Sequence, residues 1–258
     1  MKKIIALLLV AVMALSFTAC GNKAESDTAY VTDKGVLVVG ITDFKPMDYQ
    51  ENGEWVGFDA DMAKEFAKYL GVDVKFVEIG NWSLKAVELE TNAIDVVWNG
   101  MTITEEVQKL MSVSVPYCLN QQVVVMNADK AADYMTADSL SALTFAVENG
   151  SAGAESLDAL NITYTACDTQ EKALMEVASG SVDACVIDLL MAGAMIGEGT
   201  SYPNLTTAAV LTEEEYGVGF RVGSDLVEKF NAFWKEACEA GTVKACAEKY
   251  GIAKNIKD

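Results

Sequence analysis

Short apolar runs alternate with amphipathic segments from residue 36 onward. The run VLVVGI at 36–41 is apolar throughout and has strand length, which is typical of a strand that is covered on both faces. In the segment 57–71 apolar side chains recur at every fourth position, at Phe58, Met62, Phe66 and Leu70. This spacing predicts an amphipathic helix, with Asp59 able to cap its start and Gly71 its end.

The same alternation continues through the rest of the chain. Apolar, β-rich runs predict strands at 72–79, 93–100, 122–127, 143–150, 161–167, 182–188 and 215–222. Helical patterns lie at 83–92 and 170–180, and residues 223–250 are expected to form two helices that break near Gly241. Strands that alternate with helices of this length predict βαβ units and largely parallel sheets.

The two halves of this α/β pattern resemble each other. Residues 93–100 and 181–188 each follow a helix and place an aspartate directly before an apolar run. We therefore expect two α/β lobes joined by two crossings, near 118–123 and 213–219. Lobe 1 is predicted to comprise 35–121 plus 216–258, and lobe 2 to comprise 122–215. Since ligands bind beyond the carboxyl ends of the strands in open α/β sheets, two such lobes form a closing cleft.

The N-terminus has the pattern of an export signal. Lys2 and Lys3 precede an apolar run that is shorter than the ~20 residues needed to span a bilayer, which predicts a signal peptide at 1–19. Small residues lead into Cys20, an arrangement that resembles a bacterial lipobox and implies lipidation of Cys20. The alternative is an ordinary cleaved signal with an incidental cysteine. Residues 20–34 are polar and are expected to be a flexible tether, so the protein is expected to be extracytoplasmic and anchored to the membrane by lipid only.

Composition limits the classes of partner and cofactor. The apolar fraction of 51% allows a substantial core, and the formal charge of −19 becomes −21 once Lys2 and Lys3 are removed. An acidic surface repels nucleic acid and anionic headgroups, so neither is expected as a partner. The chain has no histidine and no Cys-x-x-Cys, so no metal or other cofactor is expected. Besides Cys20 it has five cysteines, an odd number that cannot all pair internally: Cys118, Cys167, Cys185, Cys238 and Cys246.

Six segments carry a more specific pattern: FKPMDY (44–49), GFDADMAKEFAKYLG (57–71), NAIDVVWNGMTITEE (92–106), VPY (115–117), ENGSAG (148–153) and GSVDACVID (180–188). In order and spacing they resemble the polar amino-acid substrate-binding proteins of ABC transporters, the bacterial extracellular solute-binding proteins of family 3. The resemblance covers nearly the whole chain after residue 35. It implies a type II periplasmic-binding-protein fold, a small-molecule ligand and an ABC transporter permease as partner.

The resemblance also implies aromatic residues in the cleft. Phe44 matches an aromatic residue that packs over the ligand's side chain, and burial in the core is the alternative role for this residue. Trp82 follows the second strand and is expected to line the same cleft. Its alternative role is partial burial at the start of a helix.

The segment Asn99-Gly100-Met101-Thr102 follows a buried strand and is predicted to bind ligand. Gly100 lets a backbone approach closely, and Thr102 with Glu105 fits the capping box of the next helix. The start of a helix presents free N–H groups, which suit the carboxylate of a ligand.

A second set of residues is expected across the cleft. Ser151 and Ala152 open another helix and offer the same kind of anion site. Asp188 ends an apolar strand, where its carboxylate can hold a ligand ammonium by charge-assisted hydrogen bonds. A plain N-cap of the following helix is the alternative role for Asp188. We expect ligand to bridge the two sets and to stabilise the closed arrangement of the lobes.

The sequence departs from the family at one position. The family pattern supplies an arginine that clamps the ligand's α-carboxylate, and this chain has Val107 there. Three explanations remain open: the helix N-termini hold the carboxylate alone, a lysine or the chain's single arginine, Arg221, substitutes, or the ligand lacks an α-carboxylate.

These features together predict a monomeric solute-binding protein that captures an amino acid or a closely related solute for an ABC importer. No catalytic residue is assigned. The alternatives are an enzyme on the same fold, such as a dehydratase or a glycan-cleaving enzyme, and a ligand-sensing module. The enzymes need a general acid or base in the cleft or an appended catalytic domain. A sensing module is usually fused to a transmembrane helix and an output domain, and neither is evident in the sequence.

Overall fold

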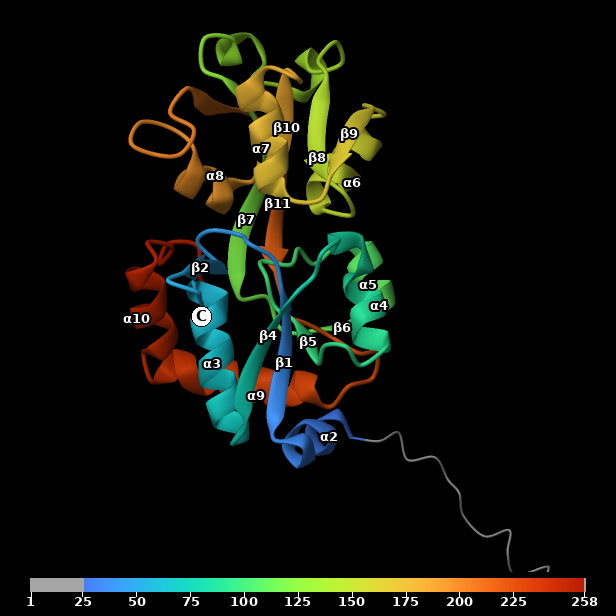
Figure 1. Cartoon of the computed structure of the whole chain (residues 1–258), viewed down its shortest axis with the longest axis vertical. Helices are drawn as coiled ribbons and strands as arrows, with labels where there is room; N and C mark the ends of the chain where they lie inside the picture. Colours follow the sequence, from blue (N-terminus) through green and yellow to red (C-terminus); the bar gives the residue numbers. More distant parts are fainter. Residues whose placement is uncertain (1–25, 258) are drawn as a thin grey trace, which may run out of the picture.

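The computed structural model describes residues 26–257, which form two α/β lobes, each built on a five-stranded sheet (Figure 1). The sheet of lobe 1 has the order β4 (Asp73–Glu78), β1 (Val36–Ile41), β5 (Val96–Val97), β12 (Gly219–Phe220), β6 (Ser112–Val113). The sheet of lobe 2 has the order β11 (Leu205–Tyr216), β7 (Cys118–Asn127), β10 (Ala184–Asp188), β8 (Phe145–Glu148), β9 (Tyr164–Cys167). A small hairpin of β2 (Tyr49–Glu51) and β3 (Glu54–Val56) follows β1.

Helices cover both faces of each sheet. In lobe 1 they are α2 (Asp27–Lys34), α3 (Phe58–Leu70), α4 (Lys85–Glu90), α5 (Glu105–Leu110), α9 (Leu226–Glu239) and α10 (Thr242–Lys249). In lobe 2 they are α6 (Ala152–Ala159), α7 (Gln170–Ser179) and α8 (Leu189–Met195). Three short 3-10 helices complete the set: η1 (Trp82–Leu84), η2 (Ala131–Asp133) and η3 (Ala137–Ser139).

Burial on both faces explains the apolar run of β1. Leu37, Val39 and Ile41 are fully buried in the cluster formed with α3 and α9, whereas Val38 packs against the cluster on the opposite face. The periodic face of α3 supplies Phe58, Met62 and Phe66 to the first cluster. The strand and helix predicted from these patterns are thus confirmed, and Gly71 ends α3 in the left-handed conformation as expected.

Two long antiparallel strands, β7 and β11, connect the lobes (Figure 1). They pair from Leu205 and Asn127 at one end to Tyr216 and Cys118 at the other, where the chain passes into the sheet of lobe 1. The expected crossings near 118–123 and 213–219 therefore fall within or just beyond these strands. In lobe 2, β7 runs antiparallel to β10, and in lobe 1, β12 runs antiparallel to β5 and β6, so both sheets are mixed rather than largely parallel.

Several boundaries differ from the sequence prediction. Residues 205–214 form most of β11 but were not predicted as a strand, because TTAAVLTEEE lacks a continuous or alternating apolar pattern. The predicted strand 93–100 shortens to Val96–Val97.

The tether prediction is wrong for residues 27–34, which form α2. Ser26 caps this helix by accepting a hydrogen bond from the N–H of Ala29 (3.0 Å). Asp225 accepts from the N–H of Thr28 (2.9 Å), and Asp27 pairs with Arg221. Tertiary contacts therefore order a polar segment whose composition alone indicated a loop.

Candidate ligand-binding site

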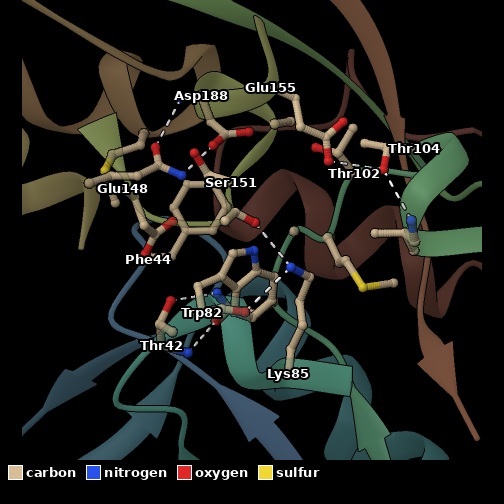
Figure 2. Close-up of a pocket in the computed structure, with 18 of the residues that line it drawn as sticks. Thr42, Phe44, Trp82, Lys85, Thr102, Thr104, Glu148, Ser151, Glu155 and Asp188 are labelled. Atoms are coloured by element: carbon tan, nitrogen blue, oxygen red, sulfur yellow. Dashed lines mark hydrogen bonds between the residues drawn. The ribbon is translucent and has the colours of Figure 1, made fainter. Parts of the chain in front are cut away.

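One cavity lies between the lobes, and all eight ligand residues predicted from the sequence line it (Figure 2). Lobe 1 contributes the segments that follow β1, β4 and β5, and lobe 2 those that follow β8 and β10, together with the start of α7. The space that no atom fills is about 490 Å³, part of it open to solvent. The eight predicted residues are Phe44, Trp82, Asn99, Gly100, Thr102, Ser151, Ala152 and Asp188.

Asp188 stands at the end of β10 with its carboxylate almost fully buried, 4% exposed. Its Oδ1 accepts hydrogen bonds from Tyr216 Oη (2.6 Å), Asn120 Nδ2 (2.5 Å) and Gln122 Nε2 (3.0 Å), and Oδ2 accepts from Gln170 Nε2. The residue occupies the N-cap position of α8, but its side chain makes no capping bond. The carboxylate is therefore held rigidly at the cavity wall and does not cap the helix.

Glu214 on β11 lies against Asp188. The same two amides serve both carboxyl groups, since Asn120 Nδ2 and Gln122 Nε2 also donate to Glu214 Oε1 at 2.6 and 2.8 Å. Burial, reinforced by the charge of Asp188, raises the pKa of Glu214 to about 8, and burial also raises the pKa of Asp188. Burial therefore favours a proton on this pair of carboxyl groups at neutral pH.

Ser151 and Ala152 form the start of α6, as predicted. Ser151 is the N-cap, and its Oγ accepts a hydrogen bond from the N–H of Ala154 (3.2 Å). The Ser151 hydroxyl keeps its own hydrogen as a donor toward the cavity.

The predicted capping box at Thr102 is wrong. Thr104 is the N-cap of α5, and its Oγ1 accepts from the N–H of Val107 (3.2 Å). Thr102 instead lies in extended backbone and forms an isolated bridge with Tyr216. The sequence offered two threonines two residues apart, and the pairing with β11 decides that the helix starts after the second one.

Gly100 and Asn99 line the cavity, but their polar groups are largely used within the protein. The N–H of Gly100 donates to Asp59 Oδ2 (2.6 Å), so Asp59 braces this loop and does not cap α3 as expected. Asn99 accepts from the N–H of Thr42 (2.7 Å) and donates to its hydroxyl (2.6 Å). Gly100 has φ +56°, and a Cβ there would lie 2.3 Å from Phe44 Cε1. The missing side chain therefore makes room for the Phe44 ring.

Phe44 and Trp82 both line the cavity (Figure 2). Phe44 is 3% exposed and packs edge-on against Tyr216, with ring centroids 6.4 Å apart. Trp82 is 7% exposed and lies beneath the ammonium of Lys85, which is 5.0 Å from its ring centroid. Both residues reach into the cleft while most of each ring is buried, so the two roles considered for each are compatible.

Lys85 is a cavity residue that sequence reasoning missed, and it is the one cation among the described residues of the lining. It is 9% exposed, and Nζ donates to the carbonyl oxygens of Gly150 (3.0 Å) and Trp82 (3.3 Å). Burial lowers the pKa of Lys85, and the charge of Glu148 opposes that shift. The available signal was its position three residues after Trp82, on the same side of one helical turn.

Arg221 does not reach the cavity and so does not replace the family arginine. Its Nε pairs with both oxygens of Asp27 at 3.0 Å, and Nη2 lies 3.4 Å from Asp95 Oδ1. Nη1 donates to the carbonyl oxygens of Ile94 (2.8 Å) and Leu89 (3.3 Å). Arg221 is therefore excluded as the cation that substitutes for the family arginine at position 107.

Further carboxyl groups line the cavity. Glu148 ends β8 and is 5% exposed, and burial raises its pKa to about 8. Burial also raises the pKa values of Asp43 and Glu155. The signal for Glu148 was its position at the carboxyl end of a parallel strand, where ligands bind in α/β sheets. The lining is thus acidic apart from Lys85.

Three other features concern the described part of the chain: potential metal ligands, cysteines and long apolar helices. Residues 26–257 contain no cluster of three or more potential metal ligands of the His, Cys, Asp or Glu type. Cys118 and Cys185 are buried free thiols, and burial raises the pKa values of both. Across the same range no helix combines the length and apolarity that a membrane span requires.

The model of the bacterial extracellular solute-binding proteins, family 3, matches residues 37–253. The chain belongs to this family. The match extends over both lobes and confirms the family that the six sequence segments indicated. The protein is therefore an extracellular solute-binding protein.

Named relatives match over almost the whole chain. The arginine-binding extracellular protein ArtP of Bacillus subtilis is 28% identical, covering 97% of this chain and 98% of its own. The probable amino-acid-binding protein YxeM of the same organism is 31% identical, covering 97% and 95%. The membrane-bound lytic murein transglycosylase F of Methylobacillus flagellatus is 27% identical, and the match spans 55% of that longer protein. Both binding proteins and an enzyme are thus among the relatives.

Solved structures confirm the predicted type II periplasmic-binding-protein fold. A mutant of ArgBP from T. maritima superposes with a TM-score of 0.80 at 34% identity, covering 87% of this chain and 98% of that one. An ABC uptake transporter substrate-binding protein from Streptococcus pneumoniae with bound histidine gives 0.80 at 26% identity, covering 88% and 97%.

Proposed function

We propose that this protein captures a free amino acid between its lobes. The observation that carries the proposal is the geometry of Asp188: a buried carboxylate, fixed by four side-chain donors, on the cavity wall. A ligand ammonium would neutralise it by charge-assisted hydrogen bonds. The Ser151 hydroxyl and the start of α6 supply donors for a carboxylate within the same cavity.

The names of the relatives support an amino acid as ligand. ArtP is arginine-binding, and the S. pneumoniae structure contains histidine. In this chain Asp43, Glu148 and Glu155 also line the cavity. This surplus of acidic groups favours a basic ligand side chain, because a cation would stabilise the ionised forms of carboxyl groups whose pKa values burial raises.

Closure of the lobes is the proposed capture step. Lys85 of lobe 1 donates to the carbonyl of Gly150 in lobe 2, and Thr104 donates to Glu155 (3.2 Å). The long strands β7 and β11 are the segments about which the lobes would rotate. A ligand that touches both lobes stabilises the closed form by its additional contacts.

The closed protein would deliver its ligand to the permease of an ABC importer, with Cys20 as the lipid anchor at the outer face of the cytoplasmic membrane. Cys20 and the signal peptide at 1–19 lie outside the described residues. Labelling cells with a radioactive fatty acid tests the anchor: the wild-type protein is expected to carry label, and Cys20→Ala is not.

Binding without chemistry is the proposed activity, in contrast to the enzymes on the same fold. Glu148 is the observation that favours the alternative, since a buried carboxyl with a pKa near 8 can act as a general acid. Recovery of each bound solute after prolonged incubation distinguishes the two. Unchanged solute supports binding, whereas conversion that Glu148→Gln abolishes supports an enzyme.

A thermal-shift screen tests the proposal. Residues 21–258, unfolded and refolded to remove bound solute, are tested against the amino acids and against analogues that lack the carboxylate or the ammonium. A ligand at 100 times its Kd stabilises the folded state by about 2.7 kcal/mol. We expect a shift with intact amino acids, largest for basic ones, and a smaller shift without either charged group. A shift only with sugars or peptides would contradict the proposal.

A further inference from the structure

Lys85 is a buried cation without a carboxylate partner in hydrogen-bond contact. An ammonium has three donors, and the two acceptors that Lys85 contacts among residues 26–257 are backbone carbonyl oxygens. Glu148 and Glu155 act on it only through their electric field. A buried charge is costly unless it is paired, so the remaining donor of the Lys85 ammonium is available to an anion that binds in the cavity.

The position of Lys85 is equally informative. It projects from the start of α4 between the Trp82 ring and the Gly150 carbonyl, facing the loop that leads to Ser151 (Figure 2). Val107 lines the same cavity, and both residues also line a neighbouring surface cavity. The short side chain of Val107 therefore leaves the space beside Lys85 free of a second cation.

We propose that Lys85 binds the α-carboxylate of the ligand, so that the cation expected at position 107 has moved to position 85. Lys85 would act with the Ser151 hydroxyl at one end of the cavity, while Asp188 holds the ammonium at the other. This inference rests on the proposed capture of an amino acid. Of the explanations considered for Val107, the proposal selects the one in which a lysine replaces the arginine. The ligand then keeps its α-carboxylate, and the helix N-termini do not hold that group alone.

Paired ligands separate the carboxylate from the rest of the molecule. Arginine with agmatine, and histidine with histamine, differ by the carboxylate alone. Calorimetry gives the Kd of each for the wild type, Lys85→Met and Lys85→Arg. In Lys85→Met we expect the amino acid to bind about 10- to 100-fold more weakly, the loss of one charged hydrogen bond, and the amine to change less than about 3-fold. Lys85→Arg keeps the charge and should stay within about 5-fold of the wild type.

Two further variants complete the test. Val107→Arg in the Lys85→Met protein restores a cation at the family position and should recover most of the lost amino-acid affinity. Lys34→Met is the matched control, because it removes a half-buried lysine of the same lobe that pairs with Asp95 away from the cavity. This control should leave the ratio of amino-acid to amine affinity unchanged.

The outcomes separate this inference from the proposed function. If the wild type binds amino acids and Lys85→Met weakens the amino acid and its amine equally, Lys85 has a general structural role and the inference fails alone. Unchanged affinities in Lys85→Met overturn it as well, as does a wild type that binds the amine as tightly as the amino acid. A wild type that binds no amino acid overturns the proposed function and the Lys85 assignment together.

Discussion

Lobe 1 contains a buried cation, Lys85, and a half-buried one, Arg221, and the protein surrounds them differently. Arg221 meets the carboxylates of Asp27 and Asp95 and two backbone carbonyl oxygens, so its donors are largely taken up within the fold. Among residues 26–257 the hydrogen-bond acceptors of Lys85 are two carbonyl oxygens and no carboxylate. A cation whose donors are satisfied stabilises the fold and has little left for a ligand, whereas a cation with a free donor beside a cavity is available to one. The same contrast separates Asp95, which is ion-paired, from Asp188, which is not.

The largest effect on stability is expected from the ion-paired cluster of Asp95, Lys34 and Arg221. Asp95 is fully buried and pairs with Lys34 (2.6 Å) and Arg221, and its Oδ2 accepts from the N–H of Val38 (2.7 Å). Asp95→Ala leaves two cations without this partner and should lower the free energy of unfolding by about 3–5 kcal/mol, measured by chemical denaturation. Ligand affinity should be unchanged in the folded variant. A loss of ligand affinity with unchanged stability would show that Asp95 serves the binding site and not the stability of the fold.

Asp188 is expected to show the opposite profile. Asp188→Asn keeps the shape but removes the charge that pairs with the ligand ammonium, so calorimetry should show the Kd of the bound amino acid rising about 30-fold or more. Its effect on the free energy of unfolding should be smaller than that of Asp95→Ala, because no ion pair within the protein is broken. Equal affinity in the variant and the wild type would exclude Asp188 from the binding site.

The pH dependence of stability should report the carboxyl groups around the cavity. The pKa values of Glu148 and Glu214 are raised to about 8, so between pH 5 and 8 the folded chain binds more protons than the unfolded chain. The free energy of unfolding of the unliganded protein should therefore fall as pH rises through this range, by at most about 1.4 kcal/mol per pH unit for each proton.

Glu214→Gln provides the matched comparison for that measurement. It removes one titrating group beside Asp188, so denaturation curves from pH 5.5 to 8.5 should show a shallower decline than in the wild type. A slope identical to that of the wild type would show that Glu214 is ionised throughout. The carboxyl groups with lowered pKa values, such as Asp61 and Asp225, release their protons below this range and do not contribute to the slope.

The smallest effect is expected at the surface. Asp168 and Lys172 form an ion pair one turn apart on the exposed side of lobe 2. Asp168→Ala should leave both the Tm and the ligand affinity unchanged, because exposed pairs are screened by solvent and salt. A clear loss of stability would show that exposed charges also matter in this acidic protein, and that the contrast between Arg221 and Lys85 is one of degree.

Much of the fold could be predicted from local patterns. The apolar run at 36–41 and the four-residue spacing in α3 match β1 and the helix because burial on one or both faces imposes these periods directly. β11 was missed because a strand that links two lobes is only partly buried and follows no single period. The α2 helix was missed because its order comes from contacts with Arg221 and Asp225, almost two hundred residues away.

The candidate site divides in the same way. Residues at the ends of strands, such as Asp188 and Ser151, could be placed in the cleft from topology and the family resemblance. The hydrogen-bond partner of each polar group could not be predicted, because the partners come from segments that are far apart in the sequence. Asn99 is taken up by Thr42, and the N–H of Gly100 by Asp59, so these residues shape the cavity wall more than they present donors to it.

The sequence by itself determined the two α/β lobes, because hydrophobic periods and the succession of strands and helices are local properties. Its motifs, through their resemblance to a known family, determined the family and the set of eight residues that meet in one cavity. Only the tertiary structure decided which charges are satisfied. It committed Arg221 to Asp27 and Asp95, set Asp188 beside Glu214, and left Lys85 facing the cavity. The reason is physical: the energy of a charge depends on every group within a few ångströms, and those groups come from distant parts of the chain.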